Sequence, residues 1–266
     1  MSMTVATADQ VAEVTMTGPG KGNAMGPDFW RELPEVFTAL DADDDVRAVV
    51  VTGSGRNFSY GLDLAAMGGA LQADPGLAAP RTKLLENLWL MQGGINAVAQ
   101  CRKPVVAAVQ GRCIGGGVDL IAACDIRYAS ADATFSVREV KVGIVADLGS
   151  LQRLPAIIGD GHLRELALTG RDIDAARAER IGLVNDVHAD AAAVLAAARA
   201  CAAEIAANPP LVVHGVKAVL QDERVDRIAR GLRYVGAWNA AFLASEDLTE
   251  AVTAVMQRRE PSFRGR

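Results

Sequence analysis

Three carboxylates follow a glycine-rich turn in the middle of the chain, and their setting suggests acid–base chemistry. Asp119 lies in the first turn of a predicted helix, and Glu139 and Asp147 follow it among apolar residues. Burial in apolar surroundings raises the pKa of a carboxylate, which then can exchange protons near neutral pH. Each acid taken alone is also compatible with a helix cap or a solvated loop, the commoner position of a carboxylate.

Two strand–glycine–helix junctions supply backbone donors close to these acids. The apolar runs 48–51 and 105–109 predict buried strands, and each leads through glycine, at Gly61 and at 115–117, into a helix-like segment. Glycine allows close approach to a ligand, and the first N–H groups of a helix have no partner within it. The two junctions can therefore direct two N–H groups at one oxygen, as an oxyanion hole does for an enolate.

Other common catalytic arrangements do not occur in the sequence. It contains neither the glycine pattern of a dinucleotide fold nor a P-loop, and neither Ser59 nor Ser150 lies in a G-x-S-x-G elbow. The three histidines, His162, His188 and His214, lie away from the acids, and no cluster has metal-ligand spacing. We therefore expect no metal and no serine-hydrolase triad.

Composition restricts the class of protein. The chain has 266 residues, half of them hydrophobic, and a formal net charge of −5, which argues against nucleic acid or an anionic membrane as the main partner. The four cysteines match neither a zinc pattern nor a disulfide framework. No apolar run reaches transmembrane length, and no signal peptide or peroxisomal address is present. The sequence predicts a cytoplasmic protein with reduced thiols.

The order of predicted elements gives an α/β core followed by a helical tail. Strands are predicted at 11–17, 48–51 and 105–109, and Gly68 to Pro80 is predicted to be a loop. The C-terminal third is helical, with segments predicted at 190–207, 212–220, 222–243 and 245–259. Such a tail can pack on another subunit.

Several segments, taken together, resemble the crotonase (enoyl-CoA hydratase/isomerase) superfamily over about residues 9–263. They are 56–64, 103–111, 115–119, 124–128 and 152–155. The resemblance implies a crotonase-like ββα spiral core at 1–195 and a helical C-terminal trimerisation region at 196–266. It also implies an acyl-CoA thioester substrate, no cofactor beyond the CoA of that substrate, no nucleic-acid or membrane partner, and a homo-oligomer, either a trimer or a hexamer built as a dimer of trimers.

The resemblance also assigns binding roles. The N–H groups of Leu62 and Gly116 would hold the thioester oxygen. Further substrate-binding positions would be Met25, Ser59, Tyr60, Gly61, Asp63 and Gly117. Tyr60 replaces a small residue and could narrow the acyl pocket, while Lys21 and Arg56 could meet CoA phosphates or be ordinary solvated charges.

Within the family, the acids are similar to those of the subgroup that converts 3,5-dienoyl-CoA into 2,4-dienoyl-CoA in the β-oxidation of unsaturated fatty acids. Hydratases carry Glu at positions 119 and 139 and usually Gly at 147. The resemblance implies that Glu139 removes a proton from C2, Asp147 protonates C6, and Asp119 tunes their charge. Three alternatives remain open: an enoyl-CoA hydratase acting on trans-2-enoyl-CoA, a Δ3-Δ2-enoyl-CoA isomerase, and a non-catalytic RNA-binding protein.

Overall fold

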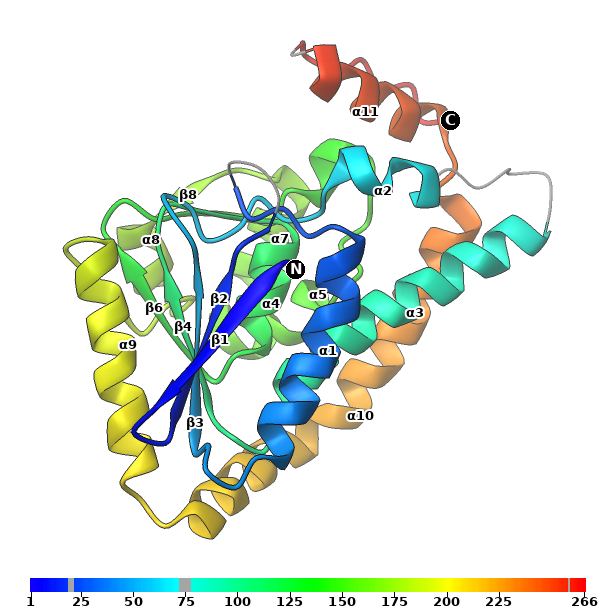
Figure 1. The fold of residues 1–266 in the computed structure, drawn as a ribbon. Coiled ribbons are helices and arrows are strands. Elements are labelled where there is room, and N and C mark those ends of the chain that lie inside the picture. Colours follow the sequence, from blue (N-terminus) through cyan, green and yellow to red (C-terminus); the bar gives the residue numbers. More distant parts are fainter. Residues whose placement is uncertain (19–21, 72–77, 258) are drawn as a thin grey trace.

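A computed structural model describes residues 1–18, 22–71, 78–257 and 259–266, which form two sheets surrounded by helices (Figure 1). The larger sheet has the strand order β1-β2-β3-β4-β6-β9, and β5, β7 and β8 form the smaller one. Apart from the antiparallel pairs β1–β2 and β7–β8, all neighbouring strands are parallel. The strands are β1 (Met3–Ala8), β2 (Val11–Met16), β3 (Ala48–Gly53), β4 (Val105–Val109), β5 (Arg112–Ile114), β6 (Ile126–Ser130), β7 (Thr134–Ser136), β8 (Ile173–Asp174) and β9 (Asp186–His188).

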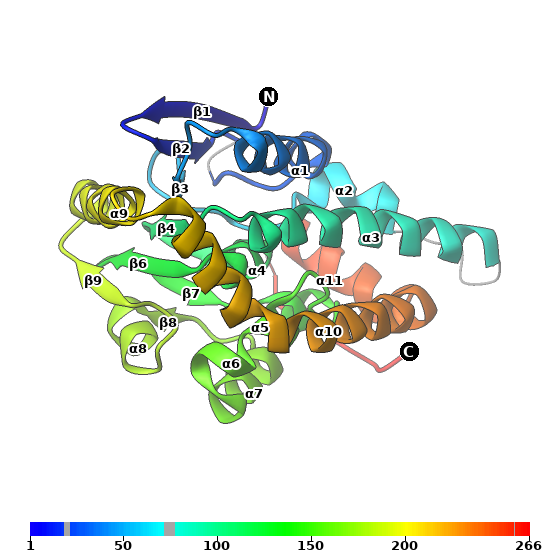
Figure 2. The same cartoon turned by 90° about the horizontal axis from the view of Figure 1, so that it is seen from below.

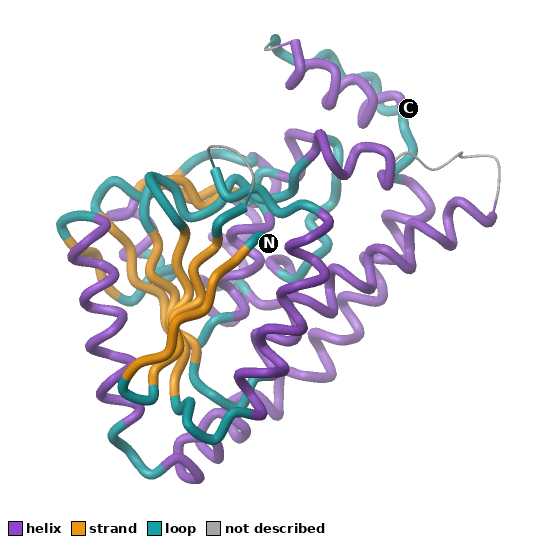
Figure 3. Tube along the Cα trace, in the orientation of Figure 1, coloured by secondary structure: helices purple, strands orange, loops and turns teal. Residues whose placement is uncertain are grey.

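The central strands β3 and β4 are buried on both faces, as their continuous apolar runs predict. Helix α9 (Ala191–Ala206) covers one face, where Val50 and Val106 pack against Ala198. The other face packs against α1 (Pro27–Ala42), α3 (Ala78–Gln100) and α4 (Gly116–Ala123). Figure 3 shows the strands as a fan between these two layers. This packing fixes the C-terminal ends of β3 and β4. The chain continues from these two ends into the segments that contain Gly61 and the glycines at 115–117.

A strand–strand–helix unit carries the glycine-rich turn. The chain leaves β4 through Gly111, whose φ is +57°, and forms β5, which pairs with β7 of the smaller sheet before α4 begins. The remaining elements are α2 (Leu64–Leu71), a 3-10 helix (Glu139–Val142), α5 (Ser150–Arg153), α6 (Pro155–Ile158), α7 (Asp160–Thr169), α8 (Ala175–Arg180), α10 (Pro210–Phe242) and α11 (Glu246–Gln257). The ββα arrangement agrees with the fold expected from the sequence.

Helix α10 runs antiparallel to α3 and crosses beneath the core (Figures 1 and 2). Two separate helices were expected at 212–220 and 222–243, but one helix of 33 residues spans both. That expectation was wrong because no proline or glycine interrupts the chain there. Gln221, at the supposed break, donates to the main-chain oxygen of Ala99 at 2.7 Å and holds the two helices together.

Two further details differ from the sequence-based expectations. Strand β1 was not predicted, because five of its six residues are exposed and the strand has no buried face. Helix α2 extends to Leu71 and α3 begins at Ala78, so the loop predicted at 68–80 is too long at both ends, and 72–77 lie outside the described residues. Lys21 also lies outside them. Within the described residues no single helix is long and apolar enough to cross a membrane, and only the pair α9 and α10, bent by 109°, reaches that length and composition when taken together.

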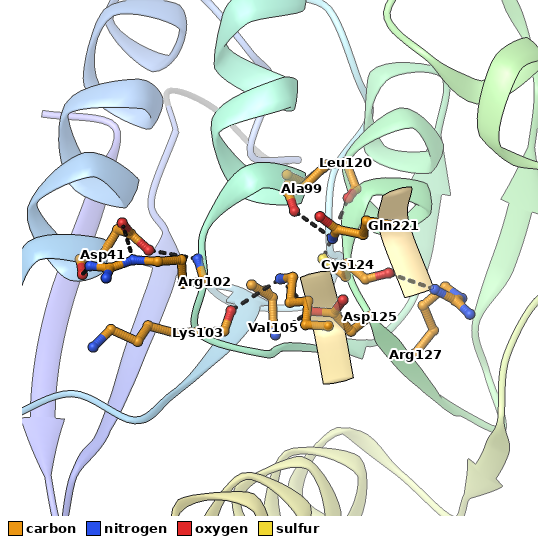
Figure 4. Close-up of polar contacts among 11 residues, drawn as sticks. Asp41, Ala99, Arg102, Lys103, Val105, Leu120, Cys124, Asp125, Arg127 and Gln221 are labelled. Atoms are coloured by element: carbon orange, nitrogen blue, oxygen red, sulfur yellow. Dashed lines mark hydrogen bonds and ion pairs between the residues drawn. The ribbon is translucent and has the colours of Figure 1, made fainter. Parts of the chain in front are cut away.

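An ion pair between a buried lysine and a partly exposed aspartate fixes the first half of α10 to the core. Lys217, only 6% exposed, donates to Asp125 Oδ2 at 2.6 Å and to the main-chain oxygen of Lys103 at 3.1 Å. Asp125 Oδ2 also accepts from the N–H of Val105 at 2.7 Å, at the start of β4 (Figure 4). The pair therefore joins α10 to the beginning of a central strand.

We expect Lys217→Met to lower the free energy of unfolding by about 3 kcal/mol, because it leaves the Asp125 carboxylate without its cation while preserving the bulk of the side chain. The matched control is Lys83→Met: Lys83 is 72% exposed and lies 4.0 Å from Glu86, so a change below about 0.5 kcal/mol is expected. Chemical denaturation followed by circular dichroism measures both. Equal losses in the two variants would contradict the structural role of Lys217.

Candidate active site

Two backbone N–H groups that bind no acceptor among the described residues meet where the loop around Gly61 touches the start of α4. Met25 N donates to Gly61 O at 2.8 Å and Asp63 N donates to Met25 O at 3.1 Å. This parallel bridge directs the N–H of Leu62 to the side away from Met25. Gly116 is the first residue of α4, so its N–H has no acceptor within the helix. The N–H groups of Leu62 and Gly116, which were expected to hold the thioester oxygen, therefore lie at the same junction.

Glycine is required at this junction for steric and conformational reasons. Gly61 has a φ of +79°, and a Cβ there would lie 2.6 Å from Ile114 O and 3.0 Å from Gly116 N. A Cβ on Gly116 would lie 3.0 Å from Met25 Sδ and 3.8 Å from Leu62 N. The two donors are therefore close neighbours, and a side chain at either glycine would intrude between them.

Asp119 is buried inside α4, directly below the glycine turn. Its side chain is 1% exposed, and Oδ1 accepts from the N–H of Ser150 at 2.5 Å. Oδ2 is buried and has no hydrogen-bond partner in the described structure. Burial raises the pKa of Asp119 to about 6, against the lowering effects of the Ser150 hydrogen bonds and the Arg153 cation.

Glu139 begins the 3-10 helix and lies against the glycine-rich turn at 115–117. Its Oε1 is 3.3 Å from the point where a Cβ on Gly115 would lie, so the missing side chain of Gly115 makes room for the carboxyl group. Oε2 is buried and receives no hydrogen bond from a fixed donor among the described residues, whereas the Glu139 and Asp119 carboxyl groups hydrogen-bond to each other when a proton lies between them. Burial, together with the negative charges of Asp119 and Asp147, raises the pKa of Glu139 well above its ordinary value.

Side chains on two helices donate hydrogen bonds to Asp147. The Nδ2 of Asn239 on α10 donates to its Oδ2 at 2.5 Å, and the Nε2 of Gln92 on α3 donates to its main-chain oxygen at 2.8 Å. Burial raises the pKa of Asp147 to about 7; the Asn239 hydrogen bond lowers it, and the charge of Asp119 raises it. The carboxyl group therefore changes protonation state near neutral pH.

The three carboxyl groups form one electrostatic cluster, since Glu139 and Asp147 each respond to the charge of Asp119. Protons on such a cluster are held in common and are released in steps that belong to the group as a whole. Arg153, 7% exposed, donates to Asn96 Oδ1 at 2.5 Å and lowers the pKa of Asp119. The site is suited to taking a proton at one carboxyl group and giving one at another.

The residues predicted to bind substrate lie at the same junction, and two of them use their side chains within the loop. Ser59 Oγ accepts from Gly61 N at 3.0 Å and donates to Asn23 O at 2.9 Å. The Asp63 carboxylate accepts from the first N–H groups of α2, at Ala65 and Ala66. These contacts shape the loop that carries the Leu62 donor.

Packing explains the other predicted binding positions. Met25 is fully buried, and a Cβ on Gly117 would lie 3.2 Å from Ser59 O, so both residues are packed beneath the loop. Tyr60 is 48% exposed and its ring lies against Gly22. Arg56 is exposed. Of these residues, Tyr60 and Arg56 are open to solvent.

Asn239, Gln92 and Arg153 were not predicted to be parts of the site. Arg153 lies inside one of the family-like segments, which is the only signal that could have identified it. Among the described residues no group of histidine, cysteine, aspartate or glutamate side chains could hold a metal ion.

Comparison with known proteins gives consistent results. Residues 6–266 match the family described as Enoyl-CoA hydratase/isomerase. The peroxisomal Delta(3,5)-Delta(2,4)-dienoyl-CoA isomerase of Arabidopsis thaliana is 43% identical over 97% of this chain and 94% of its own length. The (E)-benzylidenesuccinyl-CoA hydratase of Thauera aromatica is 33% identical over the full length of both chains. The crystal structure of an enoyl-CoA hydratase/isomerase from Xanthobacter autotrophicus Py2 superposes with a TM-score of 0.87 at 30% identity, covering 97% of this chain and 93% of that one.

Proposed function

The chain belongs to the enoyl-CoA hydratase/isomerase family, and from this membership and its three acids we infer that it is a Δ3,5-Δ2,4-dienoyl-CoA isomerase. The observation that carries this assignment is the third carboxyl group, Asp147, in one cluster with Asp119 and Glu139 beside a pair of backbone donors. Its relatives with this activity match along nearly the whole chain, at 41% identity for the Dictyostelium discoideum enzyme and 43% for the Homo sapiens enzyme.

The proposed reaction moves two double bonds by one position each. Glu139 takes a proton from C2, and the released electron pair forms a C1–C2 double bond while the thioester oxygen becomes negative. The N–H groups of Leu62 and Gly116 stabilise that oxygen. The electrons then return, forming double bonds at C2–C3 and C4–C5, and C6 takes a proton from Asp147. No atom is gained or lost by the substrate.

The distance between the two reacting carbons gives a reason for two acids. C2 and C6 are separated by four bonds, so one fixed carboxylate does not serve both ends of the conjugated system. Burial makes Glu139 a strong base when ionised, and it keeps Asp147 protonated below about pH 7. Each turnover leaves Glu139 protonated and Asp147 ionised, and a proton must then pass back between them. The negative charge of Asp119 raises the pKa of both carboxyl groups.

A spectroscopic assay tests this function. The 2,4-diene is conjugated with the thioester and absorbs at longer wavelength than the 3,5-diene. Mixing the purified protein with a 3,5-dienoyl-CoA should produce that band. Loss of absorbance from a simple 2-enoyl-CoA, with no band from the diene, would instead establish the hydratase alternative.

The paired donors give a further prediction. Gly61→Ala should lower kcat by about a hundredfold, because the new Cβ lies within contact of Gly116 N and displaces one oxyanion donor. Gly55→Ala is the matched control. Gly55 also has a positive φ, +68°, but a Cβ there meets nothing within 4 Å, so it reproduces the backbone strain alone. Steady-state kinetics of both variants measure this difference. A similar loss of kcat in the two variants would refute the oxyanion role.

We also propose that copies of the chain associate through the C-terminal helices, as a trimer or hexamer. Apolar side chains on the first half of α10 support this: Leu211 is 84%, Val219 74% and Leu220 63% exposed. Of these, Leu220 borders a hollow of about 670 Å³ between α10 and the core, which Val212 and Val216 also line. Exposed apolar surface of this kind is typical of an interface. The boundary at 195/196 and the cytoplasmic location stay predictions. The three dienoyl-CoA isomerases named above are peroxisomal or mitochondrial proteins.

A further inference from the structure

The side chain of Asn239 reaches the acid cluster from the C-terminal helix. It is 2% exposed, and its Nδ2 donates both to the main-chain oxygen of Val145, at 2.8 Å, and to Asp147 Oδ2, at 2.5 Å. The N–H hydrogens of one amide group thus serve two acceptors in the same loop. Because 92 residues separate Asn239 from Asp147, this contact exists only in the folded chain.

The contact with Val145 determines the orientation of the amide. A main-chain carbonyl can only accept a hydrogen bond, so the NH₂ end of Asn239 must face this loop. The same NH₂ group then donates to Asp147 Oδ2, and that oxygen must be an acceptor in both protonation states of the carboxyl group. Among the described residues, no other side chain donates to the Asp147 carboxyl group, and the further hydrogen bond to it comes from the main-chain N–H of Asp147 itself. A proton on this carboxyl group therefore belongs on Oδ1.

We propose that Asn239 is a positioning residue that fixes which oxygen of Asp147 carries the proton delivered to C6, by occupying Oδ2 and leaving Oδ1 as the acidic oxygen. The proposal rests on the proposed isomerase function and extends it to a residue of the C-terminal helix. Without the amide, the proton can reside on either oxygen, and only one arrangement points it at the substrate.

Gln92 provides an internal comparison. It is also a buried amide, 4% exposed, and donates to Asp147, but to the main-chain oxygen, and it bridges to Leu232 O on α10 at 3.2 Å. Gln92 therefore fixes the loop without contacting the carboxyl group. A residue that merely holds the loop should behave like Gln92, and a residue that orients the acid should not.

The role of Asn239 has a consequence for the pH dependence. The charged groups around Asp147 are Asp119 on α4 and Glu139 on the 3-10 helix, with the Arg153 cation of α5 acting on Asp119. The hydrogen bond from Asn239 stabilises the carboxylate and lowers the pKa of Asp147. Because Asp147 must be protonated to donate, activity falls as the pH rises through its pKa, and removing Asn239 moves that decline to higher pH.

The experiment compares kcat against pH for the wild type, Asn239→Leu and Gln92→Leu, with a 3,5-dienoyl-CoA as substrate. In Asn239→Leu we expect kcat to fall at least tenfold and the alkaline decline to move up by about one to two pH units. In Gln92→Leu the decline should stay at the wild-type pH even if the protein is less stable. Asn239→Ala provides the same test if Asn239→Leu does not fold.

A titration without substrate separates this proposal from the function itself. Infrared absorption of protonated carboxyl groups, with Asp147→Asn identifying the relevant band, measures the pKa of Asp147 in the free protein. An upward shift in Asn239→Leu alone supports the proposal even if the wild type fails to convert the diene, which would overturn only the function. An unchanged pKa, or an equal shift in Gln92→Leu, would overturn the role of Asn239.

Discussion

Glu139→Gln is expected to lower kcat for 3,5-dienoyl-CoA by about a thousandfold and to stop the exchange of the C2 hydrogen with solvent deuterium. Glutamine preserves the shape of the side chain beside Gly115 but cannot accept the proton from C2. Both steps of the reaction require the dienolate, so both readouts should be lost together. Absorbance of the 2,4-diene and proton NMR of the substrate in deuterated buffer measure them.

The control for this variant is Glu179→Gln, which removes the same charge from an exposed position on α8. It should leave both conversion and exchange at the wild-type rate. If exchange at C2 persisted in Glu139→Gln, the base would be a different group, and Asp119, with its unpaired buried Oδ2, would be the next candidate.

The sequence predicts the parts of the fold that depend on local pattern. The strands at 48–51 and 105–109 and the start of α4 are correct because short apolar runs bounded by glycine have few alternatives. The edge strand β1 and the continuity of α10 were not predicted. The first lacks a buried face, and the second depends on packing along α3 that a propensity argument does not contain.

In the site, too, some residues can be predicted from the sequence and others cannot. The three acids and the glycine donors can be proposed from residue type and spacing, since the chemistry demands carboxylates and free N–H groups. Their supporting residues cannot be proposed in this way, because Gln92 and Asn239 are ordinary amides on α3 and α10, 55 and 92 residues away from Asp147 in the sequence. Helical periodicity places them on a buried face and says nothing of which carboxyl group they meet.

Asp147→Asn should separate the two halves of the reaction. We expect conversion of 3,5-dienoyl-CoA to fall by about a thousandfold, because the amide has no acidic proton for C6. Glu139 and the donors at Leu62 and Gly116 are untouched, so the dienolate still forms and returns its proton at C2. Exchange of the C2 hydrogen with deuterium should therefore continue, within about tenfold of the wild-type rate.

The removal of this carboxyl group also has an electrostatic effect on Glu139. The negative charge of Asp147 is one of the causes that raise the pKa of Glu139, so this pKa should fall in Asp147→Asn. Since Glu139 must be ionised to act as a base, the acidic limb of the exchange reaction should move to lower pH. Deuterium exchange measured across pH tests both statements. Loss of exchange in step with conversion would contradict separate roles for the two acids, and would mean that Asp147 is needed already when the proton leaves C2.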